Sequence, residues 1–69
     1  MQAELKNKVK DFRNELGLTQ EDLAEKISVT RQTIISIEKG VYAPSVTLAI
    51  LLCKTLKKEV EQVFSVSKK

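Results

Sequence analysis

Residues 19–40 contain two short helix patterns in immediate succession, and this stretch restricts the fold more than any other part of the chain. Each pattern starts at a threonine, Thr19 and then Thr30, whose hydroxyl can accept an amide hydrogen from the first helical turn. Apolar residues recur at helical spacing behind each cap: Leu23, Ala24 and Ile27, then Ile34 and Ile37. Two capped helices joined by a tight turn predict a helix-turn-helix.

The rest of the chain predicts an all-α fold of five short helices around one core. Its 69 residues, 42% of them apolar and 30% charged, suit a single domain over 1–69. Two glycines and one proline favour helices with short connections. The expected helices are 3–16, one that begins at Gln20, 31–39, 46–56 with Ser45 as its N-cap, and 60–64. Alternation in Phe64-Ser-Val-Ser also permits a short strand that pairs with the N-terminus, but a helical N-terminus is the simpler interpretation.

Charge and cysteine content indicate the setting. The formal net charge of +3 is compatible with DNA without requiring it. Cys53 is the only cysteine, which excludes a disulfide framework, and its apolar neighbours predict a small buried thiol. No N-terminal stretch resembles a signal peptide, and the apolar stretch 46–53 is too short to span a bilayer. We expect a cytoplasmic protein without a membrane partner.

The start of the second helix of the pair carries side chains suited to reading DNA bases. The major groove admits one α-helix, and residues near its N-terminus reach the base edges. Arg31 can donate two hydrogen bonds to guanine, and Gln32 can pair in the same way with adenine. Ile35 and Ser36 continue along this side, where Ile35 either contacts a thymine methyl or is a plain exposed isoleucine.

Other polar residues of this region are candidates for phosphate contacts. Gln20 stands at a helix start, where donors suit an anion. Lys39 at the far end of the second helix can neutralise another phosphate. Thr33 joins them, while Thr19 and Thr30 are caps first and phosphate contacts second.

Four motifs, in order, carry a family resemblance: Thr-Gln-x-x-Leu-Ala-x-x-Ile, Val-Thr-Arg-Gln-Thr-Ile, Ile-Glu-x-Gly and Tyr-Ala-Pro-Ser. Together they resemble the Cro/C1-type (xenobiotic-response-element, XRE) helix-turn-helix regulators. The resemblance covers about residues 5–64, which it marks as the domain core. It implies a compact lambda-repressor-like fold and dimers that bind palindromic double-stranded DNA operators.

The resemblance also implies roles for single residues. Gln20 matches a glutamine that contacts phosphate and, in phage repressors, braces the first side chain of the recognition helix, here Arg31. The base-reading positions of the family correspond to Arg31, Gln32 and Ser36, with Ile35 at a thymine-methyl position and Lys39 at a backbone-contacting one. Arg13 and Glu38 match a buried ion pair, which we interpret as structural because a stranded buried charge is costly.

Three positions depart from the family pattern. Ser28 replaces the glycine usual in the turn between the two helices. Lys57 and Lys58 replace a Gly-apolar pair before the last helix. Leu51 occupies a position that is usually polar. Ser28 would be strained if that turn has a positive φ.

The helix over 46–56 is apolar around more of its circumference than its core stripe needs. Ile50 and Leu51 lie off that stripe, which fits either a central buried helix or a dimer surface. The resemblance favours the dimer, with Val60 and Val63 of the last helix completing the interface. Two recognition helices would then lie roughly 34 Å apart, one turn of DNA.

The sequence lacks the features of catalytic and ligand-binding sites. The chain has no histidine, metal-ligand cluster, glycine-rich phosphate loop or serine paired with a base, so we expect no catalysis, metal or cofactor, and no small-molecule ligand is evident. An antitoxin or adaptor that binds another protein through the helix over 46–56 is the alternative. The prediction is a small dimeric transcriptional regulator, a repressor that covers a promoter.

Overall fold

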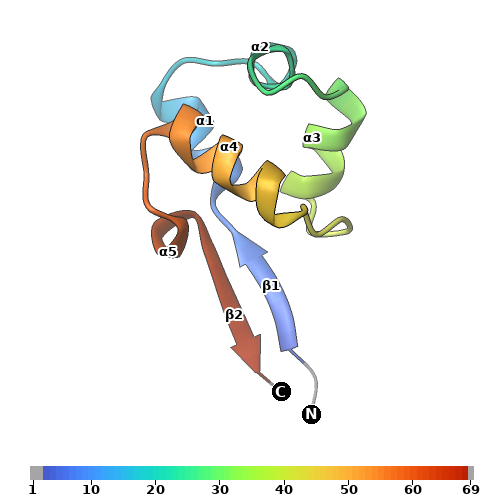
Figure 1. Cartoon of the computed structure of the whole chain (residues 1–69), viewed down its shortest axis with the longest axis vertical. Helices are drawn as coiled ribbons and strands as arrows, with labels where there is room; N and C mark the ends of the chain where they lie inside the picture. The colour runs from blue at the N-terminus through green and yellow to red at the C-terminus, as the bar shows by residue number, and fades with distance from the viewer. Residues whose placement is uncertain (1–2, 69) are drawn as a thin grey trace.

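A computed structural model describes residues 3–68, which form a body of helices and a two-stranded sheet that projects from it (Figure 1). The described elements are β1 (Ala3–Asn7), α1 (Val9–Glu15), α2 (Gln20–Lys26), α3 (Arg31–Glu38), α4 (Val46–Leu56), α5 (Val60–Val63) and β2 (Phe64–Lys68). The molecule measures 36 × 21 × 20 Å, and the sheet lies along the long direction. No helix of the described chain is long and apolar enough to cross a membrane.

The helices begin at the caps that the sequence predicts. Thr19 Oγ1 accepts from the Asp22 amide at 2.9 Å, and the Asp22 carboxylate accepts from the Thr19 amide at 2.9 Å, which completes a capping box. Thr30 and Ser45 cap α3 and α4 in the same way, each accepting an amide of the first turn at 3.2 Å. The boundaries of α2, α3 and α4 are therefore fixed by local chemistry.

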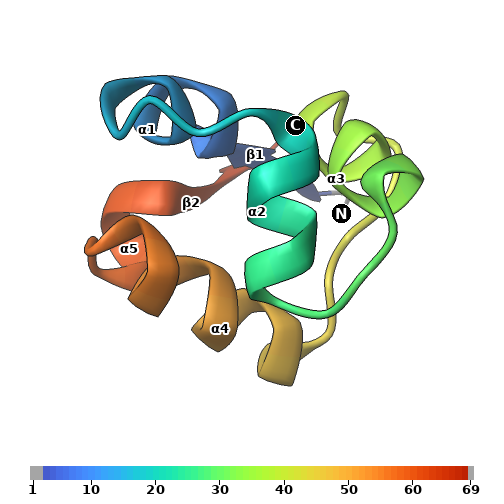
Figure 2. The same cartoon turned by 90° about the horizontal axis from the view of Figure 1, so that it is seen from above.

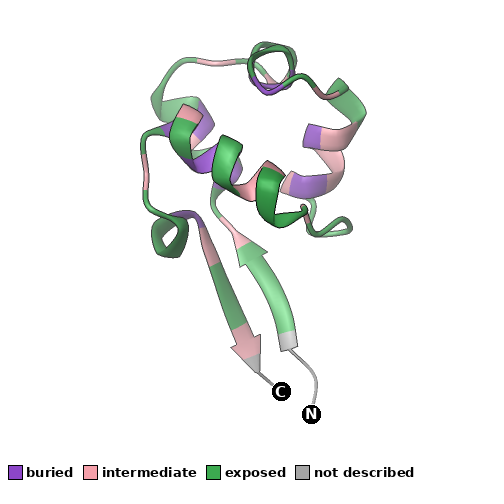
Figure 3. Ribbon diagram, in the orientation of Figure 1, coloured by how far each residue is buried: buried purple, intermediate pink, exposed green. Residues whose placement is uncertain are grey.

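The core is built from every helix. The helices are arranged around a common centre when seen from above (Figure 2). Buried residues of these helices, purple in Figure 3, form one apolar cluster. They are Val9, Leu23, Ala24, Ile27, Ile34, Ile37, Leu52, Cys53, Leu56 and Val63. The prediction of a buried thiol is confirmed, since Cys53 is only 4% exposed and desolvation raises the pKa of its thiol.

The predicted N-terminal helix is wrong in its first half, and the fold is not purely helical. Residues 3–7 form β1, which pairs antiparallel with β2, and α1 starts only at Val9. Asn7 explains the change, because its Oδ1 accepts from the Val9 amide at 3.1 Å and its Nδ2 donates to the Ile37 carbonyl at 2.9 Å. Leu5, expected on the inner face of a helix, is instead 38% exposed on the sheet.

Helices α1 to α4 end in one motif, closed by a residue with positive φ. Two of these residues are not glycine: Ser28 has φ 60° and Lys57 has φ 61°. At the end of α2, the Val29 amide donates to the Ala24 carbonyl and the Ser28 amide to the Glu25 carbonyl. Ser28 thus carries the strain expected of a side chain in this conformation.

Candidate DNA-binding surface

The packing of α2 against α3 decides which side of α3 is free. Ile34 and Ile37 of α3 are fully buried, and Leu23 and Ala24 of α2 belong to the same core. Because Ile34 and Ile37 occupy the inner face of α3, the residues on the opposite side of this helix point away from the core. One side of α3 is therefore available to a partner.

The four predicted base-reading residues lie on this free side. Arg31 and Gln32 are exposed in the first turn of α3, and Ile35 and Ser36 are half-buried in the next. Gln32 Nε2 donates to Ser36 Oγ at 3.4 Å, so these two side chains lie against each other. The structure thus gathers one guanidinium, one amide, one hydroxyl and one apolar side chain on one helical face.

The candidate phosphate contacts surround that face at the helix ends. Gln20 and Arg31 line one shallow hollow between the starts of α2 and α3, together with Thr19. Thr30 and Thr33 share a hydrogen bond of 3.0 Å between their hydroxyls. Lys39 is exposed just after α3. All five candidates are therefore near the ends of α2 or α3, flanking the reading residues.

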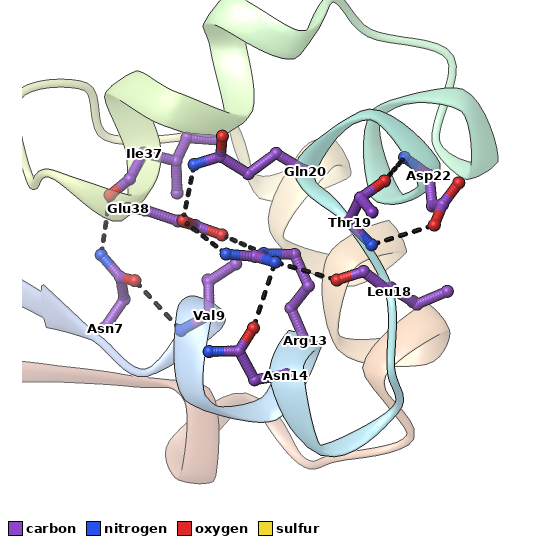
Figure 4. A network of polar contacts seen from close by, with 10 residues as sticks. All are labelled: Asn7, Val9, Arg13, Asn14, Leu18, Thr19, Gln20, Asp22, Ile37 and Glu38. Carbon is purple, nitrogen blue, oxygen red and sulfur yellow. Dashed lines mark hydrogen bonds and ion pairs between the residues drawn. The ribbon is translucent and has the colours of Figure 1, made fainter.

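An ion pair beneath this surface connects α1 with α3 (Figure 4). Arg13 Nε donates to Glu38 Oε2 at 2.7 Å and Arg13 Nη2 to Glu38 Oε1 at 3.2 Å, with side chains only 9% and 5% exposed. Arg13 Nη1 also donates to the Leu18 carbonyl at 2.8 Å, just before α2. A single guanidinium thus links α1, the segment leading into α2, and the end of α3.

Gln20 is held differently from what the resemblance implies. Its Nε2 donates to Glu38 Oε1 at 3.1 Å, and the described residues show no hydrogen bond from its side chain to Arg31. The physical reason is that the Gln20 amide donates to a carboxylate, a charged acceptor, whereas the Arg31 guanidinium has no acceptor to offer it. Asn7, which sequence reasoning missed, also supports α3 through Ile37. The position of Asn7 just before an apolar helical stripe could have indicated a helix start there, because asparagine is a preferred capping residue.

The four residues predicted to form a dimer interface do not all lie on the surface. Ile50, Leu51 and Val60 are exposed, and Ile50 and Val60 line a shallow hollow between α4 and α5. Val63 is 1% exposed within the core of its own chain. It therefore supports α5 from inside and offers no surface to a second copy.

Comparison with known proteins places the chain in a family. A helix-turn-helix family model matches residues 9–63, which includes every helix of the fold. The chain belongs to the Cro/C1-type (XRE) helix-turn-helix regulators. The regulator thus carries a helix-turn-helix DNA-binding domain, with α2 and α3 as the two helices of the motif.

Relatives in bacteria and archaea share this assignment. The regulator is 50% identical over 60 residues to YgzD of Bacillus subtilis, an HTH-type transcriptional regulator, covering 87% of this chain and 91% of that one. It is 53% identical over 57 residues to an HTH-type transcriptional regulator of Methanothermobacter thermautotrophicus, covering 81% and 83% of the two chains. Both relatives are described as HTH-type transcriptional regulators.

Solved structures share the fold. The biofilm master regulator SinR in complex with DNA superposes with a TM-score of 0.71 at 30% identity, over 77% of this chain and 86% of that one. The transcriptional regulator VanUg superposes with a TM-score of 0.80 over 100% of this chain and 92% of that one. At 13% identity, VanUg supports the regulator's fold alone.

Proposed function

We propose that the regulator binds double-stranded DNA sequence-specifically, with α3 in the major groove. The observation that carries this proposal is the position of Arg31 and Gln32. Both are exposed in the first turn of a helix whose opposite face, at Ile34 and Ile37, is locked into the core. A rigid helix with free donors at its N-terminal end suits the geometry of groove reading.

In this proposal the base contacts follow from side-chain chemistry. Arg31 pairs with guanine and Gln32 with adenine, each contributing about 1–3 kcal/mol of discrimination. Ser36, bonded to Gln32, limits the rotation of its amide and adds a hydroxyl. Ile35 covers a thymine methyl. Replacing a reading residue is expected to relax the preference at one position of the site.

We assign the flanking residues to the DNA backbone. These are Thr19, Gln20, Thr30, Thr33 and Lys39. Such contacts set the orientation of α3 and carry no sequence information of their own. Only Lys39 among these residues is cationic, and a cation that meets a phosphate releases counterions, so affinity is expected to fall by about three- to fourfold per copy of Lys39 between about 50 and 200 mM salt. Equal affinity at both salt concentrations would remove this part of the proposal.

We also propose that the regulator acts as a homodimer on a palindromic operator, and that it represses by covering a promoter. One recognition helix contacts too few base pairs for useful specificity in a genome. Ile50, Leu51 and Val60 form an exposed apolar surface on α4 and α5, which we name the α4–α5 patch. A two-fold contact there would pair identical apolar surfaces and would place two α3 helices roughly 34 Å apart.

Selection of bound duplexes from a randomised DNA pool tests the function. The expected result is an inverted repeat whose spacing reports the distance between the two α3 helices. A single half-site would retain the reading role of α3 and remove the dimer. No enrichment would contradict DNA binding and favour a protein partner on the α4–α5 patch, which the exposure of Ile50 and Leu51 would then explain.

Variants locate the reading surface. Arg31→Ala with Gln32→Ala is expected to abolish the enrichment while the circular dichroism spectrum stays unchanged. Lys10→Ala is the matched control for charge, because it also removes one cation from an exposed helical position, on α1. Unchanged enrichment in the double variant would mean that α3 does not read the sequence.

A further inference from the structure

We propose that the outer edge of β1 is a second self-association surface. There the β1 strand of another copy pairs antiparallel, and two sheets of two strands become one sheet of four. This surface is separate from the α4–α5 patch, and its formation does not depend on DNA binding.

The outer edge of β1 carries unpaired backbone groups. Within residues 3–68 the sheet has the order β1-β2, so each strand is paired on one side only. The Lys8 amide donates to the Val63 carbonyl at 2.8 Å and continues the register of the ladder. Because hydrogen-bonded pairs alternate along an antiparallel ladder, Glu4 and Lys6 also direct their backbone groups towards β2. The backbone groups of Leu5 and Asn7 therefore point to the open edge.

There is room for another strand beside this edge. Residues 4–7 line one side of an open hollow of about 600 Å³, and residues 38–43 line the other. The far half of β1 also extends beyond the helices, where β2 is the one described element next to it (Figure 1). A second strand can approach the edge without displacing a helix.

The charges of β1 are complementary to a second copy of β1. An antiparallel pair with its two-fold axis at Leu5 sets Leu5 opposite Leu5 of the other copy. It places Glu4 opposite Lys6 of the other copy, and Lys6 opposite its Glu4. In this register the Leu5 amide of each copy faces the Leu5 carbonyl of the other, which is the arrangement of a hydrogen-bonded pair. Opposite charges facing each other across strands are stabilising.

Within residues 3–68, neither charged residue has an ionic partner. Glu4 lies opposite Ser67 and Lys6 opposite Ser65, and the ion pairs found among the described residues involve neither of them. The β2 edge offers no such match, since a two-fold axis at Val66 would only set Ser65 against Ser67. Charge complementarity therefore selects the β1 edge.

An exposed apolar pair gives an independent reason for association. Leu5 lies opposite Val66 on one face of the sheet, and these residues are 38% and 61% exposed. A two-stranded sheet is only marginally stable in water, whereas a sheet of three or more strands with an apolar face can be stable. Pairing at β1 would bring the two Leu5–Val66 pairs into one continuous apolar row.

A charge-reversal cycle without DNA tests the proposal. Fluorescently labelled chains are titrated with unlabelled chains, and the dissociation constant is measured for four pairings. These are the starting protein with itself, Glu4→Lys with itself, Lys6→Glu with itself, and Glu4→Lys with Lys6→Glu. Each variant with itself sets like charges opposite each other, whereas Glu4→Lys with Lys6→Glu restores opposite charges. We expect the mixed pairing to associate about tenfold more tightly than either self-pairing. The α4–α5 patch is identical in all pairings, so it adds a constant background and any difference between pairings comes from the substituted residues.

A matched pair of variants separates local pairing from net charge. Glu25→Lys and Lys10→Glu carry the same net charges but lie on α2 and α1, away from β1. The dissociation constants of their mixed pairing and their self-pairings are expected to differ far less than those of the β1 variants. Equal dissociation constants for all β1 pairings, or an equal preference in the control set, would overturn the proposal.

Discussion

Gln20 Nε2 lies 3.1 Å from Glu38 Oε1, so the first residue of α2 is tied to the last residue of α3. The same carboxylate receives the guanidinium of Arg13. One acidic side chain thus fixes the angle between the two helices of the motif and their distance from α1. The relative orientation of α2 and α3 therefore depends on the Glu38 carboxylate as well as on the turn between them.

Removing Glu38 should strongly destabilise the protein. Glu38→Ala leaves the Arg13 guanidinium buried without its counter-ion, which costs about 3–5 kcal/mol of unfolding free energy. Urea denaturation followed by circular dichroism measures this loss. The double variant Arg13→Met with Glu38→Leu serves as the control, because it removes both charges and should recover most of the loss. A double variant as unstable as Glu38→Ala would contradict the explanation by a stranded charge.

Gln20→Ala should weaken DNA binding without changing the preferred sequence. If Gln20 contacts a phosphate as proposed, losing that contact lowers affinity for operator and unrelated DNA alike, because phosphates carry no sequence information. The lost hydrogen bond to Glu38 also lowers the free energy of unfolding by about 1 kcal/mol. Fluorescence anisotropy with both kinds of DNA measures the affinities. A changed base preference would show that Gln20 reads bases instead.

Ser28→Gly should stabilise the fold. Glycine adopts the positive φ at this position without the clash that a Cβ causes. Glycine also gives the unfolded chain more entropy, which opposes this gain. We expect a net rise of about 0.5–1 kcal/mol in the free energy of unfolding. The midpoint of urea denaturation should rise. Ser28→Ala is the control, since it removes the hydroxyl and keeps the Cβ.

Lys57→Gly provides a second test of the same cause, because Lys57 closes α4 with φ 61°. It should raise the midpoint by a similar amount. If neither glycine variant were more stable than the starting protein, backbone strain at the helix ends could not be the reason.

The capping box of α2 should make stability depend on acid pH. The hydrogen bond from the Thr19 amide lowers the pKa of Asp22 below its ordinary value of 3.8. A lowered pKa in the folded state means that ionised Asp22 stabilises the fold at neutral pH, and that this contribution is lost as the pH falls through the lowered pKa. Urea denaturation at several pH values should show Asp22→Asn less stable than the starting protein near neutrality. The difference should shrink below about pH 4. A constant difference would contradict this role.

Much of the fold could be predicted because its signals are local. Thr19, Thr30 and Ser45 each cap a helix that starts one residue later, and the core stripes of α2, α3 and α4 follow directly. The free side of α3 could be predicted for the same reason, because helical periodicity separates inner from outer positions. The positions of Arg31 and Gln32 therefore needed no tertiary information.

The missed features depend on contacts between distant residues. β1 is a strand only because residues 64–68 lie beside it, and that partner is at the opposite end of the sequence. The spacing of Leu5, Val9, Phe12 and Leu16 fits a helix as well, so periodicity favoured the wrong structure. The choice between Arg31 and Glu38 as the partner of Gln20 likewise depends on how three helices meet, which spacing alone does not encode.

The pairing of β1 with β2 also implies an order of events on the ribosome. β1 emerges before every other described element and β2 after all of them. The contacts between α2 and α3 join residues close in sequence and can form during elongation, whereas β1 must wait for residues 64–68. Translation therefore keeps the first strand without its partner until residues 64–68 have been made, and the sheet closes only after that point.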